Sequence, residues 1–178
     1  MTDANDRAVL LRIARNAIGA HVASAPPLPI GTSDVVARRG GVFVSVHHRG
    51  DLRGCIGRIS ADRRLDEVIA QCAVSACSAD PRFKPVTRSE LAEIDIELSL
   101  LAPLEAIAGP DEIEIGRHGL LVEHDRRRGL LLPQVATEWK WDAVMFLAQT
   151  CRKAGLAADV WKRADALWRF EAEVFGET

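Results

Sequence analysis

Several segments of the chain alternate apolar and polar residues with a period of two, and this pattern constrains the fold more than any other feature. It is clearest at residues 94–101, where Asp95, Glu97 and Ser99 separate aliphatic residues. It recurs at residues 42–46 and 166–174. Successive side chains of a β-strand point to opposite faces, so each segment is expected to form a strand with one buried face.

Two pairs of short β-like runs are separated by turn residues, and each pair predicts a hairpin. The first pair covers residues 42–47 and 52–59, on either side of Arg49-Gly50-Asp51. The second pair covers residues 119–124 and 129–132, joined across residues 125–128.

Apolar residues three and four positions apart predict three helices, at residues 2–22, 63–78 and 141–154. Thr2 or Asp3 caps the first helix, and Gly155 stops the last one from the C′ position. Because the hairpins are segregated from the helices, we predict an α+β fold with a mostly antiparallel sheet and flanking helices. The length fits a single domain over residues 1–178, with a core that needs no disulfide or metal to hold it.

Composition excludes several classes of protein. The apolar runs are too short for a membrane helix, and the charged residues spread through the first 20 positions are unlike a signal peptide. The four cysteines form no C-x-x-C pair, so we predict a reduced cytoplasmic protein without a metal site. The chain carries no dinucleotide or nucleoside triphosphate fingerprint. A net charge of −2 and the lack of tyrosine argue against a nucleic-acid partner.

Charge is distributed unevenly along the chain. Residues 38–64 hold seven arginines against two aspartates, whereas residues 89–125 hold ten acidic residues against one arginine. The basic segment is expected to attract anions. The alternative is that arginine richness reflects genome composition, because only four of the 23 basic residues are lysine.

The segment 52–57, LRGCIG, is the most informative part of the chain. Glycines inside a strand mark a bulge or a place where a ligand or another backbone comes close, so Gly54 and Gly57 are expected to bind a ligand. A three-residue loop at 49–51 would place Ser45 opposite Cys55 and put Arg53 on the same face as Cys55. A two-residue loop would instead place Val44 opposite Cys55.

On that face, the Arg53 guanidinium is expected to lower the pKa of the Cys55 thiol and favour a nucleophilic thiolate. The alternative is that Cys55 is a small buried residue in a tight strand. The other three cysteines fall on apolar helix faces and are expected in the core, and the four tryptophans are expected to pack rather than to stack on bases.

Three further positions carry groups capable of chemistry. His118, in Gly116-Arg117-His118-Gly119, can serve as a base at a cleft or lie in a solvated turn. Gln134 can orient a substrate through its amide or belong to a helix cap, and Asp80 and Arg82 are expected to form an ion pair in the turn that ends a helix. If Gly54 and Gly57 let the strand approach the loop of His118, then His118 and Cys55 should line one concavity.

Five strings of the sequence resemble the AMMECR domain family, whose prokaryotic members are called AmmeMemoRadiSam system protein A. They are LRGCIG at 52–57, SADPRFKPVTRSEL at 78–91, GRHGLLVE at 116–123, GLLLPQVATEWKWD at 129–142 and FLAQTCRKAGL at 146–156. The resemblance covers about residues 7–175, in the same motif order, and implies one α+β domain made of a larger and a smaller lobe. Its signature falls on Arg53, Gly54, Cys55 and Gly57, with His118 and Gln134 in supporting motifs.

The resemblance implies partners rather than a reaction, because similar prokaryotic proteins are found alongside a Memo-like protein and a radical S-adenosylmethionine protein. Two functional hypotheses follow. In the first, the protein is a small enzyme or enzyme component, with Cys55 as nucleophile, His118 as base, Arg53 holding an anionic group and Gln134 orienting a substrate; substrate and cofactor stay unspecified. In the second, it is a non-catalytic adaptor or scaffold for the Memo-like and radical proteins, docking through its basic or acidic segment.

Overall fold

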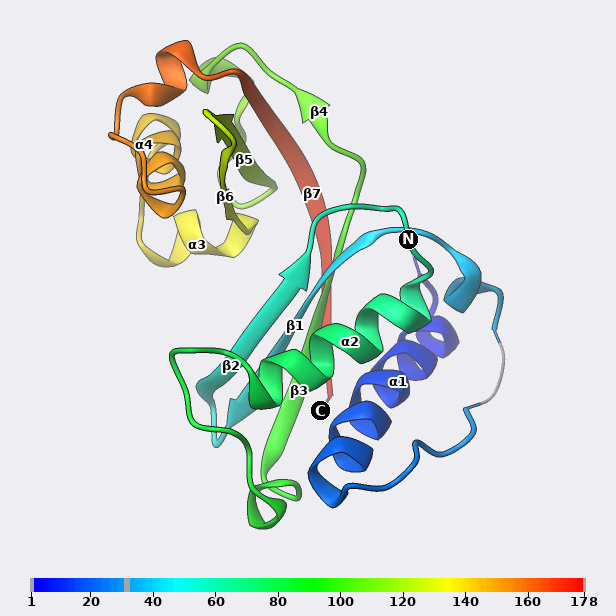
Figure 1. Ribbon diagram of the computed structural model, residues 1–178. Helices are drawn as coiled ribbons and strands as arrows, with labels where there is room; N and C mark the ends of the chain where they lie inside the picture. Colours follow the sequence, from blue (N-terminus) through cyan, green and yellow to red (C-terminus); the bar gives the residue numbers. More distant parts are fainter. Residues whose placement is uncertain (1, 31–32, 178) are drawn as a thin grey trace. The chain divides into compact units, whose positions relative to one another are not determined.

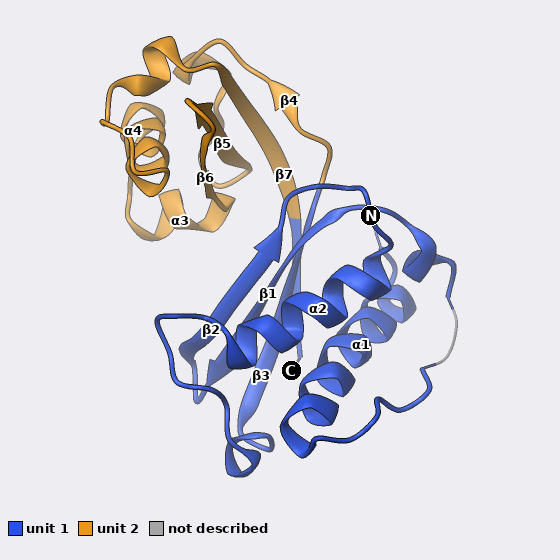
Figure 2. Cartoon of the chain, in the orientation of Figure 1, with its two compact units in different colours: residues 1–101, 173–178 blue, residues 102–172 orange. Residues whose placement is uncertain are grey.

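The chain folds into two compact units, seen in the computed structural model of Figure 1, which describes residues 2–30 and 33–177. Unit 1, the larger, comprises residues 1–101 and 173–178, and unit 2 comprises residues 102–172 (Figure 2). Each unit has its own hydrophobic core. The architecture is α+β with antiparallel strand pairs, which confirms the predicted fold class.

Unit 1 packs two helices on one face of a sheet (Figure 1). Its helices are α1 (Ala4–Ala23) and α2 (Leu65–Ser78), and its strands are β1 (Gly41–His48), β2 (Asp51–Arg58) and β3 (Ile94–Leu101). Strand β1 is central and pairs with both β2 and β3. The alternation predicted from sequence explains this core. Val44 and Leu98 pair across β1 and β3, and their side chains lie on the face of the sheet that the helices cover, where both are fully buried.

The first helix begins where its capping chemistry dictates. The Asp3 carboxylate accepts a hydrogen bond from the Asp6 N–H at 2.7 Å, so Asp3 rather than Thr2 is the N-cap. The Thr2 hydroxyl instead donates to the Glu173 carboxylate at 2.7 Å. This contact, with the Arg7–Glu173 ion pair, attaches the start of α1 to the final strand of the chain.

Unit 2 packs two helices against a second group of strands. Its helices are α3 (Pro133–Glu138) and α4 (Ala143–Lys153), and its strands are β4 (Glu105–Ala106), β5 (His118–His124), β6 (Arg127–Leu131) and the first part of β7 (Ala166–Gly176). Strand β5 lies between β6 and β7, and β4 pairs with β7. Leu120, Phe146 and Leu147 are fully buried in the core between β5 and α4.

Strand β7 is shared, since residues 166–172 count with unit 2 and the remainder with unit 1. The strand order is therefore β2-β1-β3-β7-β5-β6, with β4 on β7. Four short 3-10 helices complete the described chain, at Asp34–Ala37, Arg88–Glu90, Pro110–Glu112 and Val160–Arg163.

The predicted helices, hairpins and strands are confirmed to within a few residues, but α3 and β4 were not expected. Gly155 has φ 71° directly after the α4 C-cap residue Ala154, as predicted for a C′ glycine. The elements that sequence reasoning misses are six and two residues long, too short for a periodic pattern to develop.

The loop of the first hairpin differs from the prediction. It is a two-residue turn at Arg49 and Gly50, both with positive φ, rather than a three-residue loop. A bulge at Arg53 then adds one residue to β2, so that Val46 opposes Gly54 and Ser45 opposes Cys55. The predicted pairing of Ser45 with Cys55 is confirmed, although the extra residue lies in the strand and not in the loop.

Candidate functional site

Cys55 lies on the face of the unit 1 sheet that points away from α2, directly opposite Ser45 on β1. The Ser45 hydroxyl donates a hydrogen bond to Cys55 Sγ at 3.3 Å. Burial raises the pKa of the Cys55 thiol above its ordinary value, and the nearby carboxylates of Asp80 and Glu97 act in the same direction. The Ser45 hydrogen bond and the Arg82 charge oppose this shift without overcoming it, so the group is a neutral thiol at pH 7.

The prediction that Arg53 lowers the pKa of Cys55 is therefore wrong. The bulge directs the Arg53 side chain to the segment that follows α2, where its Nε donates to Glu90 Oε1 at 2.9 Å. The same guanidinium donates to the backbone carbonyls of Lys84 and Pro85. The hydrogen bond from Arg53, together with those from the N–H and hydroxyl of Thr87, lowers the pKa of Glu90 to about 2. A ligand that used Arg53 would have to displace Glu90.

Asp80 and Arg82 form the predicted ion pair, at 2.7 Å, and they also hold Cys55. The Asp80 carboxylate accepts a hydrogen bond from the Cys55 N–H at 2.9 Å, and the Arg82 guanidinium donates to the Cys55 carbonyl at 3.3 Å. The Asp80 side chain is 2% exposed, and its hydrogen bonds from Arg82 hold its pKa well below the usual range. The turn after α2 thus fixes the backbone of the strand at the cysteine.

The space beside Gly54 and Gly57 is filled by the protein itself. A Cβ at Gly54 would overlap the carbonyl oxygen of Ala76 in α2, and a Cβ at Gly57 would overlap the ring of Phe43. Neither glycine has open space on the side of a Cβ, and the expected approach of the loop of His118 stays a prediction. Both allow close packing, one of a helix backbone and the other of an aromatic ring.

His118 and Gln134 belong to unit 2, whereas Cys55 belongs to unit 1, so the predicted pairing of Cys55 with His118 stays a prediction. His118 is the first residue of β5 and is buried rather than in a solvated turn. Its Nδ1 accepts a hydrogen bond from the Glu114 N–H at 3.0 Å, and burial lowers its pKa. Gln134 lies in the first turn of α3, where its buried Oε1 has no hydrogen-bond partner among the described residues.

The end of α3 and the start of α4 carry a group of large apolar side chains, which we call the α3–α4 surface: the exposed Trp139, Val144 and Met145, and the half-buried Trp141. Trp139 is 67% exposed, Val144 50% and Met145 43%. The Trp139 and Trp141 rings stack with their centroids 6.0 Å apart, and Trp141 also packs against the buried Phe146. Trp139 thus packs against another aromatic ring, as expected of the tryptophans, but most of its surface stays exposed.

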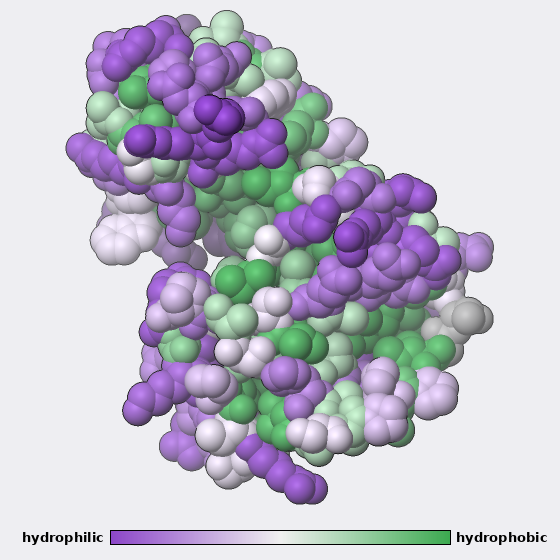
Figure 3. All heavy atoms as spheres, viewed as in Figure 1, coloured by the Kyte–Doolittle hydropathy of each residue, from purple (hydrophilic) through white to green (hydrophobic). Residues whose placement is uncertain are grey.

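Hydrophilic residues cover much of unit 2 on the face drawn in Figure 3, as is usual for a protein surface in water. Three exposed large apolar side chains within seven residues of one another, Trp139, Val144 and Met145, therefore form a distinct feature of this unit.

The basic segment 38–64 is largely neutralised within unit 1. Arg49 and Arg53 pair with Glu93 and Glu90, at 2.6 and 2.9 Å, and these glutamates belong to the acidic segment 89–125. Four of the other arginines also bind acceptors of the same unit: Arg38 to Asp6, Arg39 to the Asp62 carbonyl, Arg58 to Asp62, and Arg64 to Asp66. The two charged segments thus bind each other in part, which weakens the expectation of an anion site there.

The AMMECR1 family model matches residues 11–175. The chain belongs to the AMMECR1 family. A curated relative from Methanothermobacter thermautotrophicus is 44% identical over 177 residues, covering 94% of this chain and 92% of the relative. A protein of Methanosarcina barkeri is 40% identical, over 99% of this chain and 92% of its own length. These values confirm the family resemblance read from the five sequence strings.

A solved member of the same fold is the crystal structure of the uncharacterised protein PH0010 from Pyrococcus horikoshii. It aligns with a TM-score of 0.88 and 39% identity, covering 94% of this chain and 89% of the other. All the candidate residues lie inside the matched AMMECR1 region. The names of these relatives state no activity, so the function has to be argued from the site.

Proposed function

We propose that this protein is a non-catalytic binding component, an adaptor that docks a protein partner through the α3–α4 surface. The observation that carries the proposal is the 67% exposure of Trp139, with Val144 and Met145 exposed beside it. Covering an exposed tryptophan removes a large apolar surface from water, which favours binding. Tryptophan is also enriched among the residues that dominate interface energies. Trp141 holds the ring in place, so little conformational freedom would be lost on binding.

The charges around this surface indicate the partner's chemistry. Lys140, which lies between Trp139 and Trp141 in the sequence, is exposed. The Lys162 Nζ lies 5.6 Å from the centre of the Trp161 ring. Lys162, Trp161 and Val144 line one shallow hollow of about 440 Å³. Acidic residues lie there too, since Glu138 and Asp142 are exposed beside the tryptophans and Asp159 lines the hollow. An apolar centre with this mixed rim fits a partner that presents apolar side chains, with Asp or Glu opposite the two lysines.

The family resemblance supplies the first partners to test, a Memo-like protein and a radical S-adenosylmethionine protein, and the proposal places the complex in the cytoplasm. None of the helices in the described part of the chain is both long and apolar enough to span a bilayer.

The enzyme hypothesis is the second candidate. It is favoured by one observation, that Cys55 alone among the four cysteines is only half-buried. In that hypothesis Cys55 attacks the substrate and His118 takes a proton, while Arg53, Gly54, Gly57 and Gln134 bind the substrate. It ranks second because burial keeps the thiol protonated and Glu90 already occupies Arg53.

A binding assay with each partner protein immobilised separates the two candidates. We expect Trp139→Ala to weaken binding of the soluble chain at least tenfold, because it removes the exposed ring at the centre of the surface. Leu52→Ala is a matched control, since Leu52 is a 40% exposed apolar residue in unit 1, and it should change affinity less than twofold.

Charge reversal extends the test. Lys140→Glu and Lys162→Glu should each weaken binding, and high salt should reduce the effect. Cys55→Ser should bind normally. Unchanged affinity of the Trp139→Ala variant, or loss of binding in Cys55→Ser with a native circular dichroism spectrum, would refute the adaptor proposal.

A further inference from the structure

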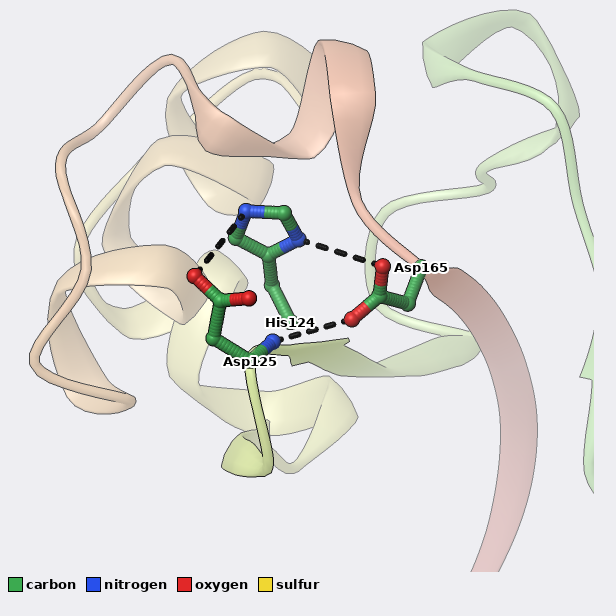
Figure 4. A group of neighbouring side chains, drawn as sticks. All are labelled: His124, Asp125 and Asp165. Carbon is green, nitrogen blue, oxygen red and sulfur yellow. Dashed lines mark hydrogen bonds and ion pairs between the residues drawn. The ribbon is translucent and has the colours of Figure 1, made fainter.

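Three potential metal ligands meet at one end of unit 2 (Figure 4). His124 ends β5, Asp125 occupies the first position of the β5–β6 turn, and Asp165 directly precedes β7. Strands β5 and β7 pair so that Glu123 opposes Ala166, which brings His124 and Asp165 together although they are 41 positions apart. One ligand atom from each residue lies within 4.8 Å of the other two.

The carboxylate of Asp165 is already oriented toward the imidazole. Its Oδ2 accepts a hydrogen bond from the Asp125 N–H at 2.9 Å, which leaves Oδ1 facing His124 Nδ1 at 3.5 Å (Figure 4). The Asp125 φ of 49° belongs to the tight turn and directs its N–H to Asp165. The orientation is therefore set by the hairpin and not by a contact between the two side chains.

The distance from His124 Nδ1 to Asp165 Oδ1 is too long for a hydrogen bond. Moreover, Nδ1 is a buried atom with no hydrogen-bond partner among the described residues, although buried ring nitrogens normally have one. Two ligands bound about 2.1 Å from one ion in tetrahedral geometry stand roughly 3.4 Å apart. The observed separation therefore matches two ligands of a shared ion.

We propose that His124 and Asp165, with Asp125, bind a divalent transition-metal ion, for which zinc is the best match. An imidazole nitrogen with carboxylate oxygens suits zinc and its neighbours, whereas calcium and magnesium prefer oxygen ligands alone. Asp125 Oδ2 lies 3.7 Å from His124 Nε2, the other ring nitrogen, and its side chain is 81% exposed. Asp125 therefore faces the other edge of the ring from Asp165, and its exposed side chain would have to rotate to join an ion bound at Nδ1. Three protein ligands leave at least one coordination position for water or for a ligand from outside.

This site is independent of the α3–α4 surface, and sequence reasoning predicted no metal site. The only local signal is a His-Asp pair at a hairpin turn, and the third ligand comes from a distant segment that the strand pairing alone brings close.

Calorimetric titration of the chelator-treated full chain with zinc chloride tests the proposal. We expect one equivalent to bind with a micromolar Kd, and cobalt to give the absorption of nitrogen and oxygen ligands without thiolate bands. Asp165→Asn keeps the acceptor for the Asp125 N–H but removes the charge, so affinity should fall at least tenfold. His124→Gln should have the same effect.

Two controls separate this site from other ligands on the surface. Asp159→Asn removes a carboxylate of the same unit that pairs with Arg163, and His48→Gln removes an imidazole of unit 1 that pairs with Glu93. Both should bind zinc as the unmodified chain does. No binding at 100 μM zinc, or equal affinity in Asp165→Asn, would overturn the proposal and leave His124 as the partner of two carboxylates in an ion-pair cluster.

Discussion

At Cys55, the reactivity of one side chain is decided by groups on two other elements. Burial disfavours the thiolate, and the Ser45 hydroxyl restores part of its stability. We therefore expect alkylation of Cys55 by iodoacetamide, followed by peptide mass spectrometry, to accelerate up to at least pH 9 and to be slower in Ser45→Ala at each pH. A rate that is already constant from pH 7 would identify a stabilised thiolate and favour the enzyme hypothesis.

His118 shows the opposite kind of titration, because burial favours its neutral form. The ordinary pKa of histidine is about 6.5, so below that pH the unfolded chain takes up a proton that the folded chain does not. The contribution of His118 to the free energy of unfolding is therefore fully present above pH 6.5. It is lost as the pH decreases from there toward the lowered pKa of the folded state.

Urea unfolding at pH 7.5 and pH 5.5 measures this loss. His118→Asn keeps an acceptor for the Glu114 N–H and should lose less stability between the two pH values than the unmodified chain. An equal loss in both proteins would assign the effect to other groups.

The sequence predicts the position of these residues better than their contacts. The pairing of Ser45 with Cys55 follows from alternation, but the direction of Arg53 does not. Gly54 signals a bulge or a close approach without showing which of the two occurs or which residue is the extra one. The contact of Asp80 with Cys55 also depends on where the turn after α2 lies over the strand. Contacts between segments far apart in the chain are fixed by packing, which local patterns do not encode.

At the scale of elements, a helix packs directly against a glycine of a strand in both units. Gly54 of β2 lies against the Ala76 carbonyl of α2, and Gly129 of β6 lies against the Thr150 carbonyl of α4. In each case the contact is near the C-terminal end of the helix. A side chain at either glycine would force the helix away from the strand, so these positions set the distance between the two layers.

Gly54→Ala should therefore destabilise the protein by about 2–3 kcal/mol, because the added methyl group meets backbone that cannot rotate away. Gly19→Ala is a matched control, since a Cβ there meets nothing within 4 Å and lies inside a helix. It should stabilise the protein by about 0.5–1 kcal/mol. Urea denaturation of the two variants gives both values, and a neutral Gly54→Ala would show that the layers adapt.

At the scale of the whole molecule, the two cores can be followed by different spectroscopic probes. All four tryptophans, at 139, 141, 161 and 168, belong to unit 2. The two longest helices, α1 and α2 with 20 and 14 residues, belong to unit 1. Tryptophan fluorescence therefore reports on unit 2, whereas helical circular dichroism reports mainly on unit 1.

A cavity in one core should separate these signals. Leu98 is fully buried in the core of unit 1, so Leu98→Ala should cost about 2–5 kcal/mol there. Because unit 2 has its own core, we expect the urea midpoint followed by circular dichroism to fall further than the midpoint followed by fluorescence. Identical shifts would show that β7, which runs through both units, makes them unfold as one.

The ion pair of Asp80 and Arg82 has a consequence for encounters between molecules. Strand β2 ends the strand order, and the outer side of such a strand offers unpaired N–H and C=O groups to any extended chain that meets it. At the middle of β2, the Asp80 carboxylate already holds the Cys55 N–H and the Arg82 guanidinium holds its carbonyl. A strand from another molecule would have to displace both charged side chains before it could form a ladder there, so the turn after α2 protects this edge of unit 1 against aggregation.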